Sequence, residues 1–170
     1  ATYGNLVHRV LTMVSRNFDG RAPEPGPLDD ADNELLEHSR RSFDATSEAL
    51  EACHFRAALQ SALGLAQATN RFLEQKAPWR AVKEDPQGAA TTLWVSLAVL
   101  NCLKTVLYPF LPFTSERLHA MLGFDGDLKA TGWSWEPGTI KPGQVLGKPG
   151  HLFVKLDESV AEEEAQRLGS

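Results

Sequence analysis

Cysteine is scarce in this sequence, and no residues have the spacing of a metal site. Among 170 residues only Cys53 and Cys102 are cysteines, and both stand in apolar helical patterns. We therefore expect two reduced core residues of a cytoplasmic protein rather than a disulfide. Neither CxxC nor HExxH occurs, so the sequence predicts no metal site and no bound cofactor in this chain.

Sequence motifs of catalysis are also missing. There is no glycine-rich phosphate-binding loop and no GxSxG segment. The histidines stand singly, and we interpret each as a surface or hydrogen-bonded residue: His8, His38, His54, His119 and His151. The paired acidic residues fit helix ends and solvated surfaces. We therefore predict no catalytic residue.

Positive charge is in deficit. Lysine and arginine number 17 against 22 aspartates and glutamates, which gives a net charge of −5. Proteins that coat nucleic acid without regard to its sequence need many cations facing the phosphates. The charge balance argues against that class. It still permits a small basic patch that recognises a few exposed bases.

Long apolar runs are interrupted. The most apolar segment, residues 93–113, contains Asn101 and Lys104 near its middle and Pro109 and Pro112 near its end. Polar residues and prolines at these positions favour a buried helix over a membrane span.

Apolar periodicity predicts an all-α fold, an up-and-down bundle of about five helices within residues 1–123. The helices are expected at about residues 1–17, 30–50, 53–76, 88–108 and 114–123. Asp29 or Asp30 is predicted to cap the second helix, and Thr114 the fifth. The first helix begins without a capping signal, so we expect it to be cut from a longer polypeptide.

Residues 124–170 are rich in glycine and proline, and they predict an irregular extension that packs back on the bundle. A short hairpin or strand is expected at 151–156 and a terminal helix at 158–168.

The stretch NRFLEQKAPWRAVK, residues 70–83, predicts an aromatic side chain at a forced corner. Pro78 disfavours helical geometry in the residue before it, so the third helix should end near Lys76 or Ala77. Trp79 then stands beside Lys76, Arg80 and Lys83. Unstacked bases bind to aromatic faces flanked by cations. On this stretch alone, a tryptophan that plugs the end of the bundle is the simpler interpretation.

Two polar residues of the first helix offer hydrogen bonds to such a base. Asn5 and Arg9 are four residues apart and share one side of the helix. Arginine supplies a fork of donors, and asparagine supplies a donor and an acceptor. A surface hydrogen-bonding pair is the alternative.

Four segments together resemble the anticodon-binding domain of methionyl-tRNA synthetases, a class I aminoacyl-tRNA synthetase family. They read GNLVHRVLTMVSRNFDG, EQKAPWRAVKED, LYPFLPFTSERLHAMLG and KPGHLFVKLDE, and they follow the family order over nearly the whole chain. The resemblance implies that Asn5 and Arg9 recognise the anticodon CAU of methionine tRNA. It implies that Trp79 stacks on the first anticodon base. It also makes Arg16, Lys76, Arg80 and Lys83 candidate phosphate contacts, although surface solubility explains each at least as well.

The resemblance further implies that a catalytic domain is missing. The chain has neither the HIGH-like nor the KMSKS-like adenylate motif, and it has no zinc-binding insertion. ATP and Mg²⁺ would belong to the parent ligase, and this piece alone should not charge tRNA. Residues 140–156 are expected to pack on the catalytic part of the same polypeptide, which would leave Trp133, Trp135 and Phe153 partly exposed here.

Two other functions remain open from the sequence. The leucyl-, isoleucyl-, valyl- and cysteinyl-tRNA synthetases carry related bundles. A helical interaction module without any RNA role would also suit the negative charge.

Overall fold

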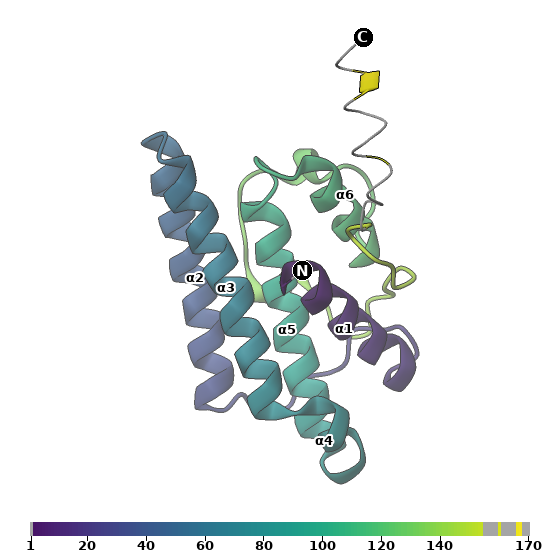
Figure 1. Cartoon of the computed structure of the whole chain (residues 1–170). Helices are drawn as coiled ribbons and strands as arrows, with labels where there is room; N and C mark the ends of the chain where they lie inside the picture. Colours follow the sequence, from purple (N-terminus) through teal and green to yellow (C-terminus); the bar gives the residue numbers. More distant parts are fainter. Residues whose placement is uncertain (1, 155–159, 161–165, 168–170) are drawn as a thin grey trace.

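The computed structural model describes residues 2–154, 160 and 166–167 (Figure 1). Over these residues it contains six α-helices and two short 3-10 helices, and it contains no β-strand. The elements are α1 (Thr2–Asn17), α2 (Asp30–Glu51), α3 (Phe55–Lys76), α4 (Pro78–Glu84), α5 (Pro86–Val106), α6 (Pro112–Met121), η1 (Leu128–Thr131) and η2 (Pro137–Thr139). The all-α prediction is confirmed, and the short helix α4 was not expected.

The core is built around α5. Every residue from Ala89 to Val106 is buried, and α1, α2, α3, α4 and α6 all contact this helix. By length and mean hydropathy α5 could cross a membrane, but 94% of its apolar window is buried by the rest of the chain. That is the behaviour expected of a bundle's central helix.

The cysteine prediction holds for one residue of the two. Cys102 is buried in the core, whereas Cys53 is exposed. Cys53 lies in the turn between α2 and α3 with φ of 58°, a left-handed conformation typical of a residue beyond a helix end. The predicted core position of Cys53 was therefore wrong, because the helix ends before it.

Helix starts follow the expected capping chemistry in α2 but not in α6. Asp29 caps α2: its side chain accepts from the backbone N–H of Asp32, whose side chain accepts from the backbone N–H of Asp29. α6 begins at Pro112, two residues before the predicted cap Thr114. Proline is favourable in a first helical turn because its missing N–H needs no partner there.

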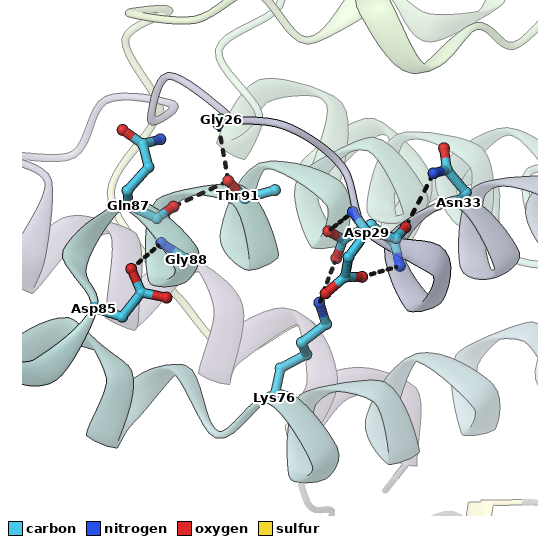
Figure 2. A network of polar contacts seen from close by, with 9 residues as sticks. Gly26, Asp29, Asn33, Lys76, Asp85, Gln87, Gly88 and Thr91 are labelled. Carbon is cyan, nitrogen blue, oxygen red and sulfur yellow. Dashed lines mark hydrogen bonds and ion pairs between the residues drawn. The ribbon is translucent and has the colours of Figure 1, made fainter.

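Lys76 joins the end of α3 to the start of α2 (Figure 2). Its ammonium group pairs with the carboxylate of Asp29, and it lies 3.0 Å from an oxygen of Asp32. The hydrogen bond from Lys76, with the one from the Asp32 backbone, lowers the pKa of Asp29 below its ordinary value. These bonds tie the C-terminal end of α3 to the N-terminal end of α2.

The loop before α2 is held against α5. The backbone N–H of Gly26 donates to Thr91 Oγ1 over 2.8 Å, and Gln87 Nε2 donates to the carbonyl of Glu24 over 3.1 Å. Asp85 in turn caps α5 by accepting from the N–H of Gly88 (Figure 2). Hydrogen bonds and ion pairs thus connect the start of α2, the end of α3 and the start of α5 next to α4.

The extension after α6 lies against the bundle in its described part. Trp135 is 3% exposed, and its indole N–H donates to the carbonyl of Ala98 over 2.9 Å. The expectation that Trp135 stays partly exposed was wrong, because α5 provides both the apolar contact and the acceptor that a buried indole needs. Trp133 and Phe153 are 40% and 44% exposed, as expected.

No strand is present at residues 151–154, contrary to the prediction for 151–156. Residues 155–159, 161–165 and 168–170 lie outside the described part, and with them most of the predicted terminal helix.

We expect Asp29→Ala to lower the free energy of unfolding by about 1–2 kcal/mol, because it removes the cap of α2 and one partner of Lys76. Urea unfolding at neutral pH measures the loss. Asp30→Ala is the matched control, since Asp30 is exposed and neither caps nor pairs in the described structure, and it should change stability little.

The effect of Asp29 should also depend on pH. A carboxyl whose pKa is lowered by folding adds stability above its unfolded pKa of about 4, and that stability is lost as the pH falls through the native value. The gap between wild type and Asp29→Asn should therefore narrow below about pH 4. A gap that stays constant down to about pH 2 would show that the charge of Asp29 is irrelevant.

Candidate nucleic-acid interface

The corner after α3 is where the sequence predicted it. Ala77 ends α3 in the left-handed conformation, with φ of 44° and ψ of 56°, and the same residue begins α4. Pro78 is buried as the first residue of α4, and Trp79 follows with 38% of its surface exposed. Trp79 is therefore not sealed inside the bundle, and its ring is open to a ligand on part of its surface.

Arg9 of α1 reaches this corner. Its guanidinium carbon lies 5.2 Å from the centroid of the Trp79 ring, a distance at which a cation is attracted to the π face. Arg9 Nη2 also donates to Glu74 Oε1 over 2.8 Å. Two segments separated by about seventy residues thus meet at one cation–aromatic contact.

Glu74 is the residue at this corner that sequence reasoning missed. It is exposed on the last turns of α3, five residues before Trp79. Its carboxylate takes one edge of the Arg9 fork and leaves other donors free, since a guanidinium has five N–H groups. No signal in a single sequence indicates a pair that forms between α1 and α3.

Asn5 lies one turn before Arg9 on the same side of α1, about 6 Å along the helix axis. It is exposed, and its amide makes no hydrogen bond with any residue in the described part of the chain. Arg16, seven residues after Arg9, falls on that side too and is exposed. One face of α1 therefore presents Asn5, Arg9 and Arg16 to solvent.

The candidate phosphate contacts on α3 and α4 differ in exposure and in whether their charges are already paired. Arg80 and Lys83 are exposed on α4, and within the described residues neither forms an ion pair. Lys76, by contrast, is 17% exposed and binds Asp29 and Asp32. Its charge is already paired with two carboxylates in a structural role, unlike the charges of Arg80 and Lys83.

The chemistry offered at this corner is recognition rather than bond-making. An exposed indole, a guanidinium beside it and an amide one turn away supply a stacking face and hydrogen-bonding groups together. Among residues 2–154, 160 and 166–167, no group of three or more His, Cys, Asp or Glu side chains gathers as a metal site would require.

Comparison with known proteins finds one family over most of the chain. The sequence model of one family, described as the anticodon binding domain of methionyl tRNA ligase, matches residues 22–170. Methionine–tRNA ligase of Roseiflexus sp. (strain RS-1) is 40% identical over 99% of this chain and 32% of its own length. The ligase of Dehalococcoides mccartyi (strain 195) is 46% identical over 99% of this chain and 30% of its own length.

Solved structures give the same result. Free Mycobacterium tuberculosis methionyl-tRNA synthetase superposes with a TM-score of 0.82 at 26% identity, over 92% of this chain and 32% of that one. The chain spans about a third of the length of each of these relatives.

We expect Trp79→Ala to lower the free energy of unfolding by about 1–2 kcal/mol, less than the loss of a fully buried tryptophan, because the ring is 38% exposed and its cation contact is on the surface. Trp135→Ala is the matched control: that indole is buried and hydrogen-bonded, so its loss should cost about 3–5 kcal/mol. Urea unfolding of both variants measures the two losses of stability. A cost at position 79 similar to that at position 135 would restore the interpretation of Trp79 as a plug.

Proposed function

Because this chain belongs to the family of methionyl-tRNA ligase anticodon-binding domains, we propose that it binds the anticodon loop of methionine tRNA and recognises CAU by stacking and hydrogen bonding. The observation that supports this proposal most is the position of Arg9, over the partly exposed ring of Trp79. A base that stacks on this face must displace the guanidinium, which would then lie within hydrogen-bonding reach of the edge of the base.

In this proposal Trp79 is the platform for the first anticodon base. Stacking of a base on an aromatic side chain contributes about 1–3 kcal/mol. Pro78 holds the indole at the corner before RNA arrives, so little ordering cost is incurred on binding. Loop bases are unstacked and can present a flat face and a hydrogen-bonding edge at once.

Arg9 and Asn5 are the proposed readers of base edges. The guanidinium can donate to a carbonyl and a ring nitrogen of one base, and the amide can both donate and accept. Because Asn5 and Arg9 are four residues apart, their positions on α1 are separated by about 6 Å along the helix axis. This distance lets the two side chains contact neighbouring bases of the loop. Glu74 keeps one edge of Arg9 occupied and so limits the directions in which the remaining donors point.

Arg16, Arg80 and Lys83 are proposed to contact phosphates of the loop. They are exposed, and they form no ion pair with described residues. Three such contacts predict a modest salt dependence, with a slope of about 0.7 per contact for single-stranded RNA. A small set of this kind is compatible with a chain whose net charge is −5.

The remaining two thirds of the relatives' length is proposed to carry catalysis. Activation of methionine with ATP and Mg²⁺ would take place there, and the 170-residue chain alone would not charge tRNA. The exposed side chain of Phe153 is proposed to face that part of the polypeptide. Its apolar ring would lose contact with water in the whole ligase.

A stem-loop titration tests the proposal. We expect the chain to bind a CAU hairpin weakly, and more weakly still when the first anticodon base is changed. Arg9→Ala and Trp79→Ala should each reduce affinity for CAU about tenfold or more, which corresponds to about 1.4 kcal/mol. Fluorescence anisotropy at a fixed salt concentration measures these affinities.

Arg41→Ala is the matched control, because Arg41 is an exposed arginine on α2 whose charge is paired with Glu37. It should leave CAU affinity within about twofold of wild type. Equal affinity for CAU and altered loops would contradict anticodon recognition and favour a helical module without this role. Preference for a loop of another class I synthetase would contradict the assignment to methionine.

A further inference from the structure

Lys104 is a buried cation for which the proposed function has no use. It lies on α5 with 3% of its surface exposed. Its Nζ is 2.8 Å from His119 Nδ1 and 3.9 Å from the centroid of the Phe124 ring. No carboxylate of a described residue lies within ion-pair distance. Burial of an ammonium group without a carboxylate at ion-pair distance is unfavourable, so another group is expected to balance its charge.

Beside Lys104 the structure has a small polar pit of about 70 Å³. Its floor is buried and its rim is exposed, so that solvent ions can enter. The pit would hold about two water molecules at about 30 Å³ each, or one small ion. It is lined by Asn101, Lys104, Thr105, His119, Phe124, Thr131, Ser134 and Thr139.

Several donors in this pit have no partner. Asn101 is 4% exposed, and its side-chain amide forms no hydrogen bond with any residue in the described ranges. The hydroxyls of Ser134 and Thr139 are also unbonded there, whereas those of Thr105 and Thr131 already donate to backbone carbonyls. The ring nitrogen His119 Nε2 is buried and has no partner among the described residues. A buried polar atom of this kind is uncommon in native proteins and indicates that something else occupies the space.

We propose that this pit is a binding site for a small monovalent anion of the chloride class. The anion pairs with the ammonium group of Lys104 and accepts hydrogen bonds from Asn101 and from the rim hydroxyls. Water alone would satisfy the amide but would give Lys104 no counter-charge within ion-pair distance. In its protonated form Lys104 repels a metal cation.

The site joins two parts of the molecule. Asn101 and Lys104 belong to the central helix α5, and Ser134 and Thr139 belong to the extension after α6. An ion held between them stabilises the docked extension, because it binds only when both parts are in place. The inference is independent of RNA recognition, and either can fail without the other.

Neighbouring charges make the anion site depend on pH. Burial lowers the pKa of Lys104 to about 7, while Glu116 on α6 opposes that shift. Burial, together with Lys104, lowers the pKa of His119, so this ring stays neutral near pH 7. Asp125, Asp127 and Lys129 are the other charged residues between α6 and the end of η1. Lys104 is then the group that gains a proton as the anion binds.

Thermal unfolding in chloride against gluconate tests the site, because gluconate is too large for the pit. Chloride replaces gluconate at constant ionic strength, up to about 0.5 M, at about pH 6 and about pH 8.5. We expect the melting temperature to rise with chloride and to saturate, with at least about a twofold larger rise at the lower pH. Equal melting temperatures in the two salts would overturn the proposal.

Lys104→Met should abolish the chloride-dependent rise, whereas Lys129→Met, which removes an exposed lysine nearby, should keep it. If Lys104→Met does not fold, crystals of the wild-type chain grown in bromide provide the second measurement. We expect an anomalous peak beside Lys104 Nζ. Bromide peaks only elsewhere on the surface, or water alone in the pit, would contradict the site.

Discussion

Pro78 cannot donate a backbone hydrogen bond, and the break that it forces after Lys76 determines where Trp79, Arg80 and Lys83 lie relative to α1. The chain turns through the left-handed conformation of Ala77 and restarts as α4 with Trp79 in its first turn. Lys76 anchors the end of α3 to Asp29 and Asp32. The indole is therefore held by an anchored helix rather than by a mobile loop. A side chain that is already in place loses less conformational entropy when it binds a ligand.

The surface proposed for RNA binding lies apart from the core and contributes little to the stability of the fold. α5 is buried over eighteen consecutive residues, Ala89 to Val106, and it contacts all the other α-helices. Asn5, Arg9 and Trp79 lie at the periphery, where a surface ion pair contributes only about 0–1 kcal/mol to folding. Side chains whose contacts with their own protein are weak remain available for a ligand.

Much of this could be predicted from residues alone, where the deciding interactions are local. The bundle follows from apolar periodicity, the cap at Asp29 from its position before α2, and the corner from Pro78. Some failures were local: Cys53 lies beyond the end of α2, and α6 begins before Thr114. Others depend on contacts between segments that are distant in sequence. Burial of Trp135 depends on the carbonyl of Ala98, the Arg9–Glu74 pair joins two helices far apart in sequence, and the pit at Lys104 forms only when the extension packs on α5. A single sequence shows none of these contacts.

Nuclear Overhauser effects between the ring protons of Trp79 and a CAU hairpin would test the stacking platform most directly. Isotope labelling of the protein separates its signals from those of the RNA, and Trp133 in the same sample provides an internal comparison, since it is also partly exposed. Contacts from the Trp79 ring to the first anticodon base, with none from Trp133, are the predicted result. Binding of the hairpin that leaves the Trp79 ring without contact to any base would contradict the stacking role.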